Sequence, residues 1–170
     1  MEIDLIQINI GDHRPINPLW SAVPRGNRHM LSWSRERAGW IARNLPSADA
    51  YFRLLPFQKT LTSLLADATI WLSYEDNPGR YGATSTRNYK DIAISSTAFR
   101  KGRWVVLATL VHELAHVAGA PGFSHAAEQA VLACGLGRRD ELLRGKDDPR
   151  TPYEPGIIGM NVGGLEKALA

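Results

Sequence analysis

Residues 103–118 read RWVVLATLVHELAHVA, an apolar stretch with few polar interruptions. At helical spacing its apolar side chains cover most sides of a cylinder, and a helix that is apolar all round is normally buried. The following residues Gly119 to Gly122 read GAPG, which ends such a helix. The sequence therefore predicts a central buried helix over residues 103–118.

This helix contains the pattern HExxH at His112, Glu113 and His116. Residues four apart lie on one face of a helix, so both imidazoles can point at one metal ion. Glu113 lies beside that face, where it can take a proton from water that the metal activates. Two imidazoles and one further ligand leave a position open for water, which makes Zn²⁺ the expected cofactor. The alternative is a core helix whose histidines bond to backbone carbonyls.

The third metal ligand has two candidates. In metzincins it is a histidine six residues after the second one, but Gly122 occupies that position here, although Gly119 matches the metzincin glycine. His125 lies just past the turn, and Glu128 lies about one turn further along the next predicted helix, on the same face. We favour Glu128 slightly as the ligand, with His125 then contacting the site or the substrate.

The remaining pattern predicts an α+β fold of one domain over residues 1–170, since no repeat or linker divides the chain. Strands are predicted at 3–10, 70–74 and 91–96, a loop or irregular strand at 81–87, and helices from Ser32 or Ser34 to 45, at 56–68 and at 125–136. Pro46 is expected to end the first of these helices, and Ser124 to cap the last. Residues 1–32 are expected to be irregular and residues 147–170 to form an extended tail.

Composition and charge argue against a nucleic-acid-binding protein, a disulfide-bonded protein and a membrane-spanning protein. The net charge is +3 and the basic residues are scattered, so nucleic-acid binding is not expected. Cys134 is the one cysteine, which excludes an intramolecular disulfide and predicts a buried thiol. No apolar run is long enough to span a membrane, and Glu2 and Asp4 interrupt the N-terminus. We expect a chain made as a soluble protein in the cytoplasm without a cleaved signal peptide.

Residues 112–137 resemble the small metallopeptidase-like toxin domains of bacterial polymorphic toxins and type VI secretion effectors. The matching features are HELAH at 112–116, GAPG at 119–122, Ala127-Glu128, and Cys134-Gly135-Leu136. The resemblance implies a zincin-like architecture in which a small twisted sheet packs on helices. Its edge strand would line the cleft, and residues 91–96 are placed to be that strand, where an extended peptide could pair. In this pattern the acidic ligand falls on Glu128.

The resemblance further implies a zinc-dependent metallopeptidase that acts on a protein or peptide, delivered into target cells by a contact-dependent system and blocked by a cognate immunity protein. A zinc amidase acting on peptidoglycan cross-links and a non-catalytic zinc-binding protein of the same fold are the alternatives. The oxyanion of the reaction needs a further donor. Tyr81, Arg87, Tyr89 and Tyr153 are candidates, with Tyr153 placed first. His13 and His29 are expected to be surface histidines.

Overall fold

A mixed four-stranded sheet forms one side of the molecule in the computed structural model, which describes residues 5–122 and 124–136. In spatial order the strands are β1 (Gln7–Ile8), β2 (Trp71–Glu75), β4 (Asp91–Ser95) and β3 (Gly82–Thr84). The first three are mutually parallel, and β3 pairs with β4 in the antiparallel direction. The fold is α+β, as the sequence predicts.

The position of β4 corrects one prediction. Residues 91–95 do form a strand, but it lies inside the sheet between β2 and β3, and all five of its residues are buried. The edge strand next to it is β3, whose three residues fall in the segment 81–87 that was predicted as a loop or irregular strand. The predicted strand at 3–10 is reduced to the two residues of β1 within the described part.

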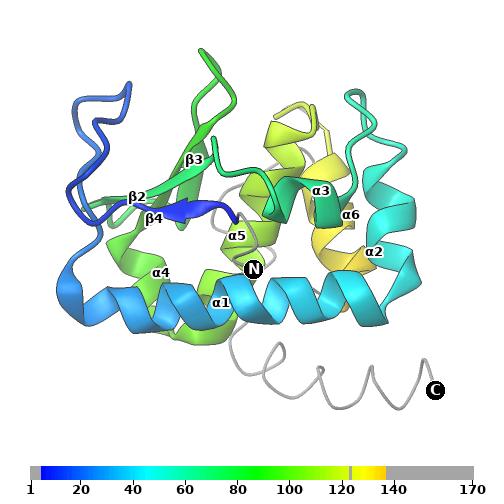
Figure 1. Ribbon diagram of the computed structural model, residues 1–170, viewed down its shortest axis with the longest axis horizontal. Helices are drawn as coiled ribbons and strands as arrows, with labels where there is room; N and C mark the ends of the chain where they lie inside the picture. Colours follow the sequence, from blue (N-terminus) through cyan, green and yellow to red (C-terminus); the bar gives the residue numbers. More distant parts are fainter. Residues whose placement is uncertain (1–4, 123, 137–170) are drawn as a thin grey trace.

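The described part of the chain has six helices. They are α1 (Arg25–Asn44), α2 (Pro46–Phe52), α3 (Leu61–Leu65), α4 (Ser96–Lys101), α5 (Arg103–Val117) and α6 (Ala126–Ala133). In Figure 1, α1 runs along the lower side of the molecule, with the sheet to the left and α2, α3 and α6 to the right. The α5 helix packs against α1, α4, α6 and β3, and so connects the two sides.

Helix α1 starts earlier than predicted. It begins at Arg25, directly after Pro24, so residues 25–32 are helical rather than irregular. Pro24 fixes a dihedral angle that suits a helix entry, and burial of Leu31 in the core stabilises the added turns. The predicted end near residue 45 is confirmed within a residue.

The prediction that Pro46 ends the first helix is confirmed, and the prediction of a helix over 56–68 is wrong in its bounds. Pro46 ends α1 but also begins α2, because proline suits the first position of a helix, whose N–H needs no partner. The helix predicted over 56–68 shortens to α3, because Gln58 has a positive φ of 55° and interrupts it. Thr60 then caps α3 by accepting a hydrogen bond from the Ser63 backbone N–H at 3.0 Å.

The last two helices agree with the sequence. Helix α5 spans nearly the predicted residues, and α6 lies within the range 125–136. His125 occupies the N-cap position of α6, while the Ser124 hydroxyl accepts a hydrogen bond from the Ala126 N–H at 3.2 Å. Cys134 is a buried thiol as predicted, and burial raises its pKa. The predicted tail at 147–170 lies outside the described residues.

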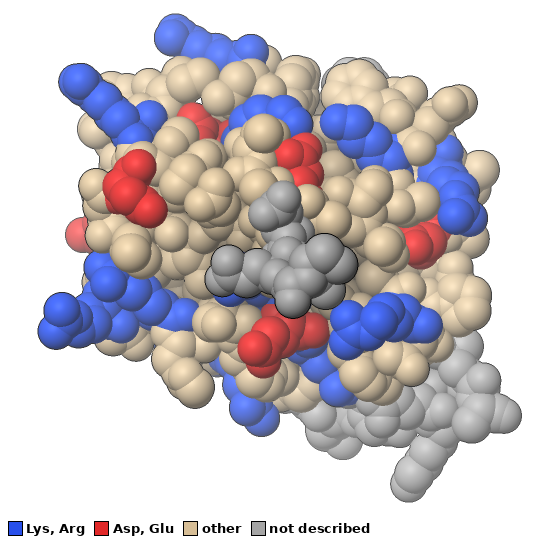
Figure 2. All heavy atoms as spheres, in the orientation of Figure 1, with Lys and Arg blue, Asp and Glu red and all other residues tan. Residues whose placement is uncertain are grey.

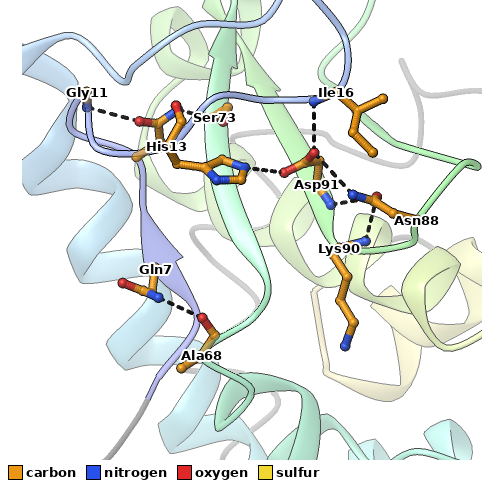
Figure 3. Close-up of polar contacts among 10 residues, drawn as sticks. Gln7, Gly11, His13, Ile16, Ala68, Ser73, Asn88, Lys90 and Asp91 are labelled. Carbon is orange, nitrogen blue, oxygen red and sulfur yellow. Dashed lines mark hydrogen bonds and ion pairs between the residues drawn. The ribbon is translucent and has the colours of Figure 1, made fainter.

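The segment between β1 and α1 has little regular structure, yet polar contacts attach it to the sheet (Figure 3). His13 Nε2 lies 2.7 Å from Asp91 Oδ1, and the Ile16 backbone N–H donates to Asp91 Oδ2 at 3.0 Å. The His13 ring also stacks on Trp71 with centroids 4.4 Å apart. His13 is thus a half-buried anchor rather than a surface histidine, whereas His29 is exposed as predicted.

The surface carries its charges in a mixed pattern. On the face drawn in Figure 2, Lys and Arg are spread over the surface with Asp and Glu between them. Among the described residues, no helix has both the length and the hydropathy needed to cross a bilayer.

Candidate metal site

Helix α5 buries the polar residues of the HExxH pattern among apolar neighbours. His112 and Glu113 are 1% and 2% exposed, and Leu110, Val111 and Leu114 beside them are 0% exposed. Burying imidazoles and a carboxylate costs free energy unless they are bound by suitable partners. The partners of these side chains therefore decide what the site can do.

The two histidines converge as the spacing predicts. Their Nε2 atoms lie 3.3 Å apart, and their ring centroids 5.0 Å apart. Two nitrogens at about 2.05 Å from a tetrahedral zinc ion would be separated by about 3.3 Å. The same separation also permits one neutral imidazole to donate a hydrogen bond to the other. The nitrogen spacing of His112 and His116 therefore suits two ligands of a single zinc ion.

The turn after α5 fixes the orientation of His116. Its Nδ1 lies 2.7 Å from the carbonyl oxygen of Ala120, so Nδ1 carries the proton and Nε2 presents a lone pair. Gly119 makes this turn possible with a φ of +99°. A Cβ at Gly119 would also come within 3.0 Å of Pro56 Cβ and 3.3 Å of the Phe57 ring. The GAPG turn thus selects the tautomer that a metal ligand requires.

Strand β3 positions Glu113. The Thr84 hydroxyl lies 2.6 Å from Glu113 Oε2 and donates to it, with the Glu113 carbonyl oxygen 3.1 Å away. Such a short approach between strand and helix requires Gly82. A Cβ there would meet Thr109 Cγ2 at 2.6 Å and the Ala93 carbonyl oxygen at 2.9 Å. The edge strand therefore holds one carboxylate oxygen of the general-base candidate in a fixed place.

A cleft of about 380 Å³ opens over these residues, and we call it the metal-site cleft. His112, Glu113 and His116 of α5 and all three residues of β3 line it. The other lining residues are Phe57, Arg80, Thr86, Tyr89 and those of the 119–122 turn. The two histidines and the glutamate therefore border one open space, as a substrate site requires, although His112 and Glu113 are almost fully buried.

No third ligand joins the two histidines in the described part of the chain. Among residues 5–122 and 124–136, no group of three His, Cys, Asp or Glu side chains is arranged to hold a metal ion. His125 lies at the N-cap of α6, and Glu128 lies in its first turn with 2% exposure. Neither is among the residues that line the metal-site cleft. Burial, followed by the charge of Glu128, raises the pKa of Tyr51, which places Glu128 close to α2.

The predicted oxyanion donors are distributed around the site. Tyr89 lines the metal-site cleft and packs edge-on against Phe57, with centroids 5.7 Å apart. Arg87 is exposed and lines an adjoining cleft, while Tyr81 is 8% exposed and belongs to the core. Tyr153 lies outside the described residues. Of the four candidates, the structure brings Tyr89 to the metal-site cleft.

Two residues at the site were not predicted. Thr84 donates a hydrogen bond to Glu113. Arg80 lines the metal-site cleft. Its hydrogen bonds to Glu75 raise the pKa of Arg80 most, and the nearby charge of Glu113 raises it further. Arg80 follows the DNPG turn at 76–79, which connects β2 to β3, but these two strands are not neighbours in the sheet. This turn signal marks the end of β2 and does not identify β3 as the edge strand.

Comparison with known proteins adds no relative, since no protein-family model, no curated protein and no solved structure matches the chain.

Proposed function

We propose that this chain is a zinc-dependent hydrolase of peptide bonds with a zincin-like fold. The observation that carries the proposal is the convergence of His112 and His116, with Nε2 atoms 3.3 Å apart, in a cleft that Glu113 also lines. A small sheet packed on helices, with an edge strand along this cleft, agrees with the architecture that the toxin-domain resemblance implies.

In this proposal His112 and His116 are two zinc ligands, and Glu128 or His125 supplies the third. Zinc, when bound, lowers the pKa of water and polarises a carbonyl group. Glu113 takes the proton from the attacking water and passes it to the leaving amine. The hydrogen bond from Thr84 keeps the Glu113 carboxylate in one orientation during both transfers. The Tyr89 hydroxyl is the described candidate for a donor to the developing oxyanion.

The Glu113→Gln variant tests the catalytic role, with Glu36→Gln as a matched control on the exposed side of α1. Zinc content would be measured by elemental analysis and activity by the cleavage of labelled, denatured casein and of purified peptidoglycan. We expect Glu113→Gln to keep its zinc and to lose at least about a hundredfold in rate, while Glu36→Gln matches the wild type. Hydrolysis confined to peptidoglycan would favour an amidase. Zinc binding without hydrolysis by any variant would identify a non-catalytic zinc protein.

The biological role that we propose is that of an antibacterial effector. Expression of the wild type in a susceptible bacterium should then stop growth, and Glu113→Gln at an equal protein level should not. An immunity protein that protects the cell would be expected to cover the metal-site cleft, which Glu113 lines. Equal toxicity of the two forms would contradict a role that depends on hydrolysis.

A further inference from the structure

A second cleft of about 410 Å³ adjoins the metal-site cleft at the edge strand, and we call it the arginine cleft. The two clefts share Arg80, Ala83, Thr84 and Thr86. Strand β3 and the residues next to it therefore separate the two spaces while belonging to both. A molecule seated over Glu113 can extend across this edge into the arginine cleft.

The outer wall of the arginine cleft is held in place although it has no regular secondary structure. It includes Ile16 and Trp20 from the segment before α1. The Ile16 N–H donates to the buried Asp91 carboxylate at 3.0 Å (Figure 3). The Trp20 indole N–H donates to Glu75 Oε2 at 3.1 Å. Both anchors are buried acids of neighbouring interior strands, so the wall is attached to the sheet at two points.

Arg80 is fixed at the junction of the clefts by the same buried acid. Its Nε donates to Glu75 Oε1 at 2.7 Å, and its Nη2 donates to Glu75 Oε2 at 2.8 Å. The Ser95 hydroxyl also donates to Glu75 Oε1 at 2.6 Å. Burial would raise the pKa of Glu75, but the hydrogen bonds from Arg80, Ser95 and Trp20 outweigh it and hold that pKa below its usual range. Glu75 is therefore ionised and keeps the guanidinium plane in one orientation.

The lining of the arginine cleft favours an anion. It includes two guanidinium groups, Arg80 and Arg87, and the hydroxyls of Ser85 and Thr86, and no Asp or Glu is among its described lining residues. The Thr84 hydroxyl also lines the cleft, but its proton is donated to Glu113. Glu75 balances the charge of Arg80, and Arg87 adds a second guanidinium group to the lining. The ion pair occupies two of the five N–H groups of Arg80, and the described residues accept no other hydrogen bond from it. Arginine N–H groups and hydroxyls together form a donor set suited to a carboxylate.

We propose that the arginine cleft is a substrate subsite that binds a carboxylate of the peptide, so that the enzyme prefers an acidic group close to the scissile bond. That the bound molecule is a substrate rests on the proposed function. The binding of a carboxylate in the arginine cleft does not require zinc or catalysis. Arg80 and Arg87 are then specificity-determining residues, and Glu75 is a positioning residue that acts through Arg80.

The test measures binding by calorimetry on metal-free protein, at constant salt, with acetyl-triglutamate amide and acetyl-triglutamine amide as probes. We expect the glutamate peptide to bind at least about tenfold more tightly to the wild type. Arg87→Gln, which changes an exposed side chain, should remove most of this preference. Arg43→Gln, an equal charge change at the far end of α1, should preserve it. Arg80→Lys, checked for folding by its thermal midpoint, should weaken the preference as well.

Two further probes identify the source of the carboxylate. Acetyl-trialanine with a free C-terminus is compared with its amide, and inorganic phosphate is used as a competitor. Preference for either carboxylate peptide over its uncharged partner supports the subsite and tells whether side-chain or terminal acids are bound. Equal binding of charged and uncharged peptides, equal effects of Arg87→Gln and Arg43→Gln, or binding of phosphate alone would overturn it. If the zinc-loaded wild type hydrolyses no peptide but the preference for a carboxylate peptide is observed, only the proposed function is contradicted.

Discussion

The Thr84 hydroxyl donates a 2.6 Å hydrogen bond to Glu113 Oε2, which joins the edge strand to the helix that carries the HExxH pattern. Residues of both elements line the metal-site cleft, so the contact couples the wall of the cleft to its general-base candidate. A hydrogen bond to a carboxylate is stronger than one between neutral groups. The orientation of Glu113 is therefore set by a residue 29 positions earlier in the chain.

Replacing Thr84 by valine removes this donor and keeps the shape of the side chain. We expect the turnover rate to fall about tenfold with little change in zinc content, because a misoriented base affects the proton transfer and not the metal ligands. Thr84→Ser restores the hydroxyl and should recover most of the rate. An unchanged rate in Thr84→Val, measured with labelled casein, would mean that the contact has no catalytic role.

Gly82 is expected to be intolerant of a side chain. In Gly82→Ala the new Cβ would meet Thr109 Cγ2 and the Ala93 carbonyl oxygen. Ala93 belongs to β4, so its backbone cannot move away without breaking the β3–β4 pairing. We expect a loss of about 1–3 kcal/mol in the free energy of unfolding, measured with urea. Gly26→Ala is the control, since a Cβ at Gly26 contacts nothing within 4 Å and alanine favours the helix. Equal stability of the two variants would contradict the close packing of β3 on α5.

Asp67 is expected to make stability depend on pH in the acidic range. Burial would raise the pKa of Asp67, but hydrogen bonds from Lys90 and Thr69 dominate and lower the pKa to about 2. A carboxylate with a lowered folded-state pKa stabilises the protein above its unfolded pKa of about 3.9, and this contribution is lost as pH falls towards 2. Asp67→Asn should therefore be less stable than wild type at pH 6, by about 1 kcal/mol or less because the pair is partly solvated. The difference in urea midpoint should shrink between pH 4 and pH 3, and a constant difference would contradict the ion pair.

Asp91 is expected to hold the wall of the arginine cleft. One oxygen of its carboxylate accepts a hydrogen bond from the Ile16 N–H, and the other contacts His13 Nε2. An asparagine has only one acceptor oxygen and so cannot keep the two contacts. We expect Asp91→Asn to lose about 1–3 kcal/mol of stability and to speed hydrogen exchange at the Ile16 amide. The exposed Asp76→Asn substitution provides the control. Exchange at Ile16 that matches the wild type would show that the segment is held by other contacts.

The elements that the sequence predicts well are those with a strong local pattern. Helix α5 is apolar on nearly every side. In β2 and β4 apolar residues alternate with other residues between turn segments, so periodicity and turn chemistry identify all three elements. The convergence of His112 and His116 follows from the helix alone, because residues four apart share a face. The site residues on α5 could therefore be predicted without knowledge of the tertiary fold.

The elements that the sequence misses depend on long-range packing. Strand β3 has three residues, Gly-Ala-Thr, which carry no alternating pattern and form a strand because β4 pairs with them and Gly82 fits against α5. Contacts of Arg80 and Thr84 with the site arise from this pairing. The early start of α1 depends on burial of Leu31. Helix α2 is not predicted because Pro46 is read as a helix end, although proline also suits the first position of a helix. The distance of Glu128 and His125 from the two histidines depends on how α6 packs after the turn, which residue spacing does not determine.

Zinc per chain is the measurement that tests the central claim most directly. Elemental analysis would compare wild type, purified without chelator and offered zinc, with His112→Gln, His116→Gln, Glu128→Ala and His125→Ala. We predict about one zinc ion per wild-type chain, loss of binding in both HExxH histidine variants, and loss in one of the last two, which names the third ligand. A wild type that binds no zinc, or a histidine variant that binds as much zinc as wild type, would rule out the proposed metal site.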